Sequence, residues 1–311
     1  MNLFVQGMRR SGTTILYDAL LEDRELRCFY EPLREQKVSV GGGSGARADD
    51  AFGETGELRE RFRAERYPDL EIGEFNWGGP RKPPLEVDPG LPEHCTEWLG
   101  WLLSSDGDVA IKETRFYSKV PELAALDGGA ALAHVVRDPR AVAASIVLGR
   151  GRRQEQMLPD ADAFFADRSD RKLWSCRPIS RRIIRKGLAD GADPAALEDP
   201  SNVLRVLLVW RLTFERTLRD GRRLYGDRYV LVRNEDLRGD PAGGLGAVYG
   251  ALGRELPDAV AAWAASHVRE PEPVYAGDDP RWADELRRAG ITPELLSEAG
   301  YSADPAATLE R

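Results

Sequence analysis

The sequence predicts an α/β fold in which a central, mostly parallel sheet is flanked by helices in three layers. Two observations lead to this prediction. Short apolar runs of strand length alternate with segments that carry apolar residues at helical spacing. Most of these runs end in glycine or charged residues just before a helical segment begins. Such units pack a parallel sheet between helices, and ligands bind where the strands end.

The first predicted unit is a strand, a turn and a helix. Residues 3–5 form an apolar run that ends at Gly7, and residues 14–21 place apolar side chains at helical spacing. The long polar stretch that follows is rich in glycine and proline, apart from a charged, helix-like segment at residues 57–66. It predicts an insertion near residues 35–105, made largely of mobile loop.

The remaining elements continue the alternation. The predicted strands are residues 109–111, 133–136 and 229–232, and the predicted helices are residues 141–148 and 203–218. Residues 150–200, rich in Arg, Asp and Pro, predict a second insertion. A single domain over residues 1–311 is expected.

The composition excludes several classes of protein. The net charge of −8 argues against a broad nucleic-acid-binding face, and no apolar run approaches the ~20 residues of a membrane span. The three cysteines form no CxxC pair and the three histidines no H-x-x-x-H, so neither a disulfide framework nor a zinc site is expected. No metal is therefore expected. A cytoplasmic protein is expected, because the cysteines suggest no disulfides and residues 1–7 lack a signal-peptide pattern. Only six of the 44 basic residues are lysines; arginine suits bidentate binding of oxyanions.

The first turn has the pattern of an anion-binding loop. It reads Gly7-Met8-Arg9-Arg10-Ser11-Gly12-Thr13-Thr14, between a predicted strand and a predicted helix. Backbone N–H groups and the positive end of the helix then face one small concavity. The spacing nearly matches the nucleotide-binding P-loop, except that Thr13 stands in the lysine position, so the fold is P-loop-like. Arg10 supplies charge for a shorter anion, and the alternative is an ordinary strand-to-helix turn.

A second candidate anion site lies near mid-chain. Asp138 suits the N-cap of a helix and Pro139 its first position, so Arg137 leaves a strand just as the helix begins. Ser145 lies two turns further along. Arg137 and Ser145 are candidates to hold a second anion; the alternative is a capped helix with a surface arginine.

Together, the R-x-S-G-T-T turn and the R-D-P-R-x-x-x-x-S junction resemble motifs of sulfotransferases that use 3′-phosphoadenosine 5′-phosphosulfate (PAPS). The resemblance is closest to carbohydrate sulfotransferases of the galactose and N-acetylglucosamine 6-O type. It extends to residues 29–33, 111–115, 232–237 and 282–302, and covers most of the chain outside the two insertions.

The resemblance implies a role for each motif residue. Arg10 matches the basic residue that contacts the 5′-phosphosulfate, Arg9 is a secondary candidate, and the loop is completed by Ser11, Gly12, Thr13 and Thr14. Arg137 and Ser145 match the pair that binds the 3′-phosphate. The product is then adenosine 3′,5′-bisphosphate, and the acceptor a sugar or small-molecule hydroxyl. The sequence departs from the family at Ile15, where the cytosolic branch has a tryptophan for adenine, at Asn234, where related motifs have tyrosine, and in lacking the late R-K-G-x-x-G element.

The predicted catalytic residues lie at other strand ends. Glu31 matches the place of a catalytic glutamate in related carbohydrate sulfotransferases and is the first candidate for the base; the alternative is a structural ion pair. Lys112 ends a strand and is expected to neutralise the transferring sulfuryl oxygens, with Glu113 as a reserve base. His134 is predicted to be a core residue. Trp98 and Trp101 have core spacing, although with Trp77 they are also candidates for a stacking wall.

Two other functions remain open on the sequence. One is a P-loop kinase or NTPase that uses Arg10 in place of lysine. The other is a nucleotide-binding module without catalysis.

Overall fold

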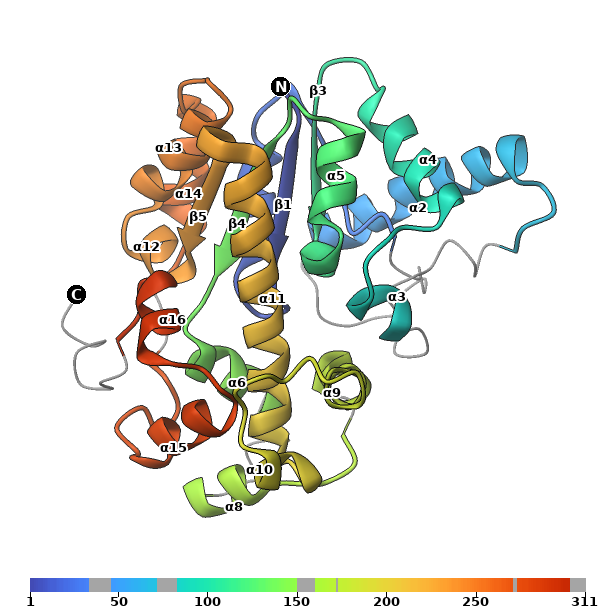
Figure 1. The fold of residues 1–311 in the computed structure, drawn as a ribbon. Coiled ribbons are helices and arrows are strands. Elements are labelled where there is room, and N and C mark those ends of the chain that lie inside the picture. The colour runs from blue at the N-terminus through green and yellow to red at the C-terminus, as the bar shows by residue number, and fades with distance from the viewer. Residues whose placement is uncertain (34–45, 72–82, 150–159, 172, 271–272, 303–311) are drawn as a thin grey trace.

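At the centre of the protein lies a five-stranded parallel β-sheet (Figure 1). The computed structural model describes residues 1–33, 46–71, 83–149, 160–171, 173–270 and 273–302. The strands lie in the order β2-β3-β1-β4-β5, and each neighbouring pair is parallel. Their bounds are β1 (Leu3–Gly7), β2 (Leu26–Tyr30), β3 (Asp108–Glu113), β4 (Ala131–Val136) and β5 (Tyr229–Arg233). The predicted α/β fold is confirmed.

Helices cover both faces of the sheet, because alternate residues of β1 point to opposite sides. Leu3 and Val5 pack against one layer, formed by α1 (Thr13–Leu20), α13 (Pro241–Ala251) and α14 (Asp258–His267). Phe4 packs against the other, which includes α4 (Glu93–Leu103), α5 (Val120–Leu126) and the end of α11 (Asn202–Tyr225). The three predicted layers are present.

The strand register brings the carboxyl ends of the strands into one row. Gly7 pairs with Val135 of β4, Tyr30 of β2 with Lys112 of β3, and Val136 with Arg233 of β5. The chain turns to β2 and β3 on one side of β1 and to β4 and β5 on the other. The space between β1 and β4 is therefore the switch point, where open parallel sheets bind ligands.

A third group of helices lies beyond this carboxyl edge (Figure 1). The long helix α11 has 24 residues, so it spans roughly 36 Å and continues past the strand ends. Around it pack α6 (Pro139–Val147), α8 (Ala161–Ala166), α9 (Cys176–Arg185), α15 (Arg281–Arg288) and α16 (Pro293–Glu298). These helices form the wall that faces the carboxyl edge.

In the first insertion, the helix-like segment predicted at residues 57–66 is confirmed, whereas the prediction of mobile loop is wrong for most of the other described residues. The described residues form α2 (Ala46–Arg66), α3 (Pro83–Val87) and α4, and the second insertion likewise contains α8, α9 and α10 (Pro194–Glu198). Helix α2 is polar nearly all round, so it gives little periodic signal, and packing positions it. Phe62 is 3% exposed, with its ring 5.4 Å from that of Trp98 and 5.8 Å from that of Trp101. The glycine run at residues 41–45 and Trp77 lie outside the described residues.

None of the helices in the described part of the chain has the length and apolar character needed to cross a bilayer.

Candidate functional site

The loop between β1 and α1 lies at the centre of the carboxyl edge. Its backbone is left-handed at Arg10 (φ 73°) and at Gly12 (φ 94°), and the Ser11 N–H donates to the Met8 carbonyl at 3.1 Å. Gly12 is the N-cap of α1 and supplies no side-chain cap. The first N–H groups of the helix therefore face the loop without a capping side chain, which is the arrangement that binds anions.

Asn234 closes the loop from the side of β5. It begins the short helix α12 (Asn234–Gly239), and a Cβ on Gly12 would lie 1.8 Å from its Nδ2. Only glycine fits there. The Asn234 Nδ2 and the Ser11 Oγ are both buried without a hydrogen-bond partner among the described residues. Buried polar groups are nearly always satisfied, so these two point to a polar group bound at the loop.

Arg10 and Arg137 lie together at this loop. The Arg10 Nε donates to the Ser145 Oγ at 2.8 Å, and an Arg137 Nη1 donates to the Arg10 carbonyl at 3.4 Å. Trp210 of α11 holds the end of β4 by donating from Nε1 to the Arg137 carbonyl at 2.9 Å. The structure thus brings the two predicted anion sites into direct contact, whereas the sequence suggested two separate pockets.

The start of α6 follows the prediction. Asp138 is the N-cap and accepts from the Arg140 N–H at 2.8 Å, and Pro139 occupies the first turn. The Asp138 N–H donates in turn to a Glu235 oxygen at 3.2 Å, and the Tyr301 hydroxyl donates to the other at 2.6 Å. Burial raises the pKa of Glu235. The C-terminal segment and α12 therefore hold the junction that carries Arg137.

A buried ion pair lies at the ends of β2 and β3. The Lys112 Nζ donates to the Glu31 Oε1 at 2.6 Å and lies 3.9 Å from the centroid of the Tyr30 ring. Burial opposes the charged ammonium, but Glu31 and Tyr30 outweigh it, so the pKa of Lys112 lies above its usual value. The Tyr30 hydroxyl lies 3.1 Å from the Thr14 Oγ1. This contact connects the ion pair to the anion-binding loop.

Glu113 is the next carboxyl along the edge and is fully buried. Its Oε1 accepts from the Thr114 N–H at 2.8 Å, whereas its Oε2 has no partner among the described residues. Burial, reinforced by the charge of Glu31, raises the pKa of Glu113 to about 7. A carboxyl that titrates near neutrality beside a candidate base is typical of a functional site.

Arg9 has a different partner from Arg10. It is 7% exposed, and its Nη2 lies 2.7 Å from both oxygens of Glu86 in α3. Glu86 also approaches Arg115 at 3.5 Å and accepts from the Tyr117 hydroxyl at 3.4 Å. The guanidinium of Arg9 thus lies in the interior below the loop. No sequence signal pointed to Glu86, because it lies within the polar insertion.

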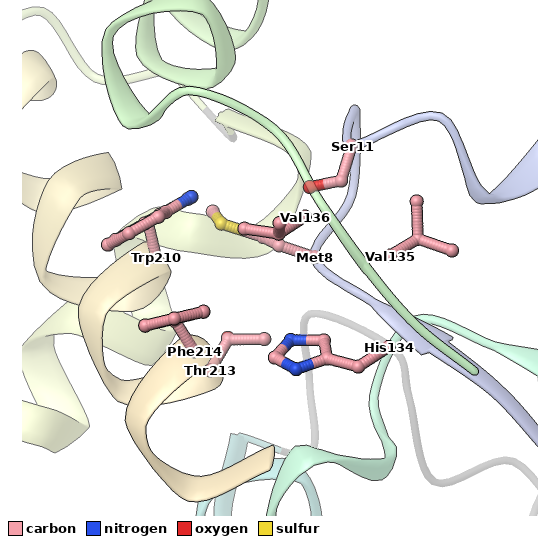
Figure 2. Close-up of a pocket in the computed structure, with 8 residues that line it drawn as sticks. All are labelled: Met8, Ser11, His134, Val135, Val136, Trp210, Thr213 and Phe214. Carbon is pink, nitrogen blue, oxygen red and sulfur yellow. The ribbon is translucent and has the colours of Figure 1, made fainter. Parts of the chain in front are cut away.

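The loop rests on α11 through a narrow gap. Figure 2 shows Ser11 and His134 projecting toward Trp210, Thr213 and Phe214 of that helix. His134 is buried, as predicted, and its Nδ1 lies 2.9 Å from the Tyr229 hydroxyl. Burial lowers the pKa of His134 to about 3, so its ring is neutral. This histidine belongs to the floor of the site.

Trp174 is a neighbour of Arg10 that sequence reasoning missed. It lies in the short 3-10 helix η3 (Leu173–Ser175), and the Arg10 Cζ is 5.8 Å from the centroid of its ring. The side chain is 45% exposed. A lone tryptophan among arginines and aspartates carries no periodic signal, so only the tertiary structure reveals its position.

No family model matches the chain, and no curated protein matches it. Solved structures similar to it include a sulfotransferase from Mycobacterium avium, with 16% identity over 96% of this chain and 74% of that one, and a TM-score of 0.49. The sulfotransferase domain from the curacin biosynthetic pathway has 13% identity over 97% and 98% of the two chains, and a TM-score of 0.46. A sulfotransferase from Mycobacterium tuberculosis H37Rv has 16% identity over 96% and 75%, and a TM-score of 0.45. At these identities and TM-scores, the likeness does not assign a function to this chain.

The contact between Gly12 and Asn234 leads to a prediction about stability. Gly12→Ala introduces both left-handed strain, about 1–2 kcal/mol, and a clash with the Asn234 amide, about 1–3 kcal/mol more. Chemical denaturation is expected to show a larger loss than for Gly253→Ala, where φ is 65° and a Cβ meets open space. Adding Asn234→Ala to Gly12→Ala is expected to recover the clash component. Equal losses for the two glycine variants would contradict the proposed close approach.

The raised pKa of Glu113 leads to a prediction about pH. Because its folded value of about 7 exceeds the ordinary value of 4.5, the folded chain retains a proton that the unfolded chain releases. The stability this provides is present below about pH 4.5 and is lost as the pH rises through 7. Glu113→Gln should remove this loss and gain stability relative to wild type between pH 5 and pH 8, on the order of 2 kcal/mol. Chemical denaturation at pH 5 and pH 8 measures the free energy of unfolding, with the exposed Glu255→Gln as control. The same pH dependence for wild type and Glu113→Gln would refute the prediction.

Proposed function

We propose that this protein transfers a sulfuryl group from PAPS to a hydroxyl of a carbohydrate or glycosylated small molecule. The observation that carries the proposal is the convergence of Arg10, Arg137 and Ser145 at the uncapped start of α1. Two arginines there suit a ligand with two anionic groups. The sequence resemblance identifies those groups as the 5′-phosphosulfate and the 3′-phosphate.

The residues present fit such a co-substrate. Arg10 and the loop residues Ser11, Gly12, Thr13 and Thr14 would hold the 5′-phosphosulfate, and Arg137 and Ser145 the 3′-phosphate. The unsatisfied Ser11 Oγ and Asn234 Nδ2 support this assignment, because both need a polar partner at the loop. Thr13 in place of the P-loop lysine favours a ligand other than a nucleoside triphosphate. Arg9, ion-paired with Glu86, supports the loop from below.

The reaction moves an SO₃ unit in line between two oxygens. The acceptor oxygen forms a bond to sulfur as the bond from sulfur to the 5′-phosphate oxygen breaks. The electron pair of the broken bond remains on adenosine 3′,5′-bisphosphate. Negative charge grows on that oxygen, where the Arg10 guanidinium and the first N–H groups of α1 stabilise it. Positioning and charge stabilisation dominate, as in phosphoryl transfer.

Glu31 acts on the proton of the acceptor hydroxyl, and Lys112 on the charge of the transferring sulfuryl group. The Glu31 carboxylate is the base that accepts the proton of the attacking hydroxyl. Lys112 orients Glu31 through the 2.6 Å contact. When Glu31 takes the proton it loses its charge, and the Lys112 ammonium becomes available to the sulfuryl oxygens. Glu113, with its pKa of about 7 and its electrostatic interaction with Glu31, is the reserve base.

A sugar acceptor and a cytoplasmic location are parts of the proposal. The sugar preference rests on the motif resemblance at residues 29–33 and 111–115, which includes Glu31 and Lys112. The cytoplasmic location rests on the three cysteines, all of which are free thiols in the structure.

Removing Arg137 should weaken one end of the co-substrate only. Adenosine 3′,5′-bisphosphate is expected to bind Arg137→Ala roughly 10- to 100-fold more weakly than wild type, because a charge-assisted contact is lost. Adenosine 5′-phosphate lacks the 3′-phosphate and should bind both proteins alike. Calorimetric titration measures both affinities. The control is Arg24→Ala, an exposed arginine just before the amino end of β2. Stabilisation of wild type by ATP or GTP with magnesium, but not by the bisphosphate, would favour a kinase or NTPase instead.

Replacing Glu31 by Gln should stop turnover while sparing binding. The amide keeps an acceptor for the Lys112 ammonium but cannot take the proton, so the rate should fall about 10²- to 10⁴-fold. Transfer of ³⁵S from PAPS to methyl β-D-galactopyranoside and methyl 2-acetamido-2-deoxy-β-D-glucopyranoside measures the rate, with the exposed Glu25→Gln as control. Affinity for adenosine 3′,5′-bisphosphate should not change. A rate within a few-fold of wild type would remove Glu31 from the mechanism.

A further inference from the structure

Trp174 is turned outward although its neighbours are buried. Leu173 is 4% exposed and Cys176 fully buried, whereas Trp174 is 45% exposed. Of the large hydrophobic residues in the described part of the chain, Met1 alone shares this degree of exposure. The indole therefore adds little to the core, and its outward position calls for a separate explanation.

The backbone around Trp174 is strained. Leu173, Trp174 and Ser175 have φ values of 45°, 51° and 73° in succession, and none of them is glycine. The left-handed conformation costs about 1–2 kcal/mol per residue, so the surrounding structure must impose it. Outside this run, the left-handed non-glycine residues among those described are Arg10, Glu31 and Ala276. Two of these three belong to the proposed reaction site, where such strain tends to concentrate.

The position of the ring relative to Arg10 suggests what it contacts. The Arg10 Cζ lies 5.8 Å from the Trp174 ring centroid, within the range of a cation–π contact. Under the proposed function, on which this inference rests, Arg10 holds the phosphosulfate. An attacking hydroxyl must approach the sulfur to about 3–3.5 Å. The adenine is separated from the sulfur by a phosphate and a ribose, so a ring beside Arg10 belongs to the acceptor side.

We propose that Trp174 is the platform on which a pyranose ring of the acceptor stacks. The indole is 45% exposed, and the Arg10 guanidinium lies beside it. A pyranose matches this environment, because it has an apolar C–H face for the indole and hydroxyls for the polar surroundings of Arg10. An aryl acceptor has two apolar faces and few polar groups, so it needs an enclosed apolar pocket. Stacking also orients one hydroxyl toward the sulfuryl group.

The test separates acceptor binding from nucleotide binding. Trp174→Ala should raise KM for methyl β-D-galactopyranoside or methyl 2-acetamido-2-deoxy-β-D-glucopyranoside about tenfold, because a stacking contact is lost. KM for PAPS and affinity for adenosine 3′,5′-bisphosphate should stay at wild-type values. Trp174→Phe should retain most of the acceptor affinity. Trp263→Ala, on α14 and away from the carboxyl edge, is the matched control, and thermal melts confirm that each variant is folded.

Other outcomes overturn the inference. Weaker binding of the bisphosphate by Trp174→Ala, with KM for the glycosides unchanged, would place the ring at the nucleotide. Unchanged constants for both would leave the ring without a role in binding. Transfer by wild type to 2-naphthol but to neither glycoside would exclude the pyranose. Failure of wild type to bind adenosine 3′,5′-bisphosphate is a different result, since it overturns the proposed function itself.

Discussion

The hydrogen bond from Arg10 to Ser145 joins two motifs, and much of the site depends on it. The two residues lie 135 positions apart, one after β1 and the other on α6. They meet because β1 and β4 are neighbouring parallel strands, paired from Leu3 with Ala131 to Gly7 with Val135. A shift of this register by one residue would turn the side chains of β1 to the wrong layers and move Arg10 away from α6. The geometry of the site is therefore fixed by the same pairing that fixes the core.

Two buried ion pairs lie near the carboxyl edge of the sheet, Arg9 with Glu86 and Lys112 with Glu31. Buried ion pairs are weak contributors to stability, because the cost of removing both charges from water offsets much of their attraction. Their effect here is electrostatic, because they place fixed charges in the buried, low-dielectric part of the site, near the partly exposed Arg10 and Arg137. A group that reacts there meets charges that are already oriented, which is the condition for strong stabilisation of a transition state.

The sequence predicted the parts of the site that depend on local signals. Gly7, Gly12 and the residues between them indicate a strand-to-helix turn, and Asp138 with Pro139 indicates a capped helix; both are present as predicted. Strand and helix alternation also predicted the sheet. The missing parts depend on long-range contacts. Glu86 and Trp174 lie in polar segments without periodicity, and only packing against α9, α6 and the loop brings them to the site. The contact of Asn234 with Gly12 likewise depends on the neighbouring strand ends.

The division between local and long-range signals corresponds to a division of tasks. The residues that would bind the nucleotide follow β1 and β4, so any chain with this sheet and these two turns positions them alike. Trp174 and Glu86 come from the insertions, whose placement depends on packing particular to this chain. Backbone strain follows the same division, since left-handed non-glycine residues persist only where the surrounding structure imposes them: Leu173, the first residue of the strained run, and Cys176, which follows it, are both buried in the core. The insertions reach the anion-binding loop at Arg9, through Glu86, and at Arg10, through the Trp174 indole. A substitution of Trp174 therefore changes the surroundings of Arg10 while the strand ends that carry the loop stay the same.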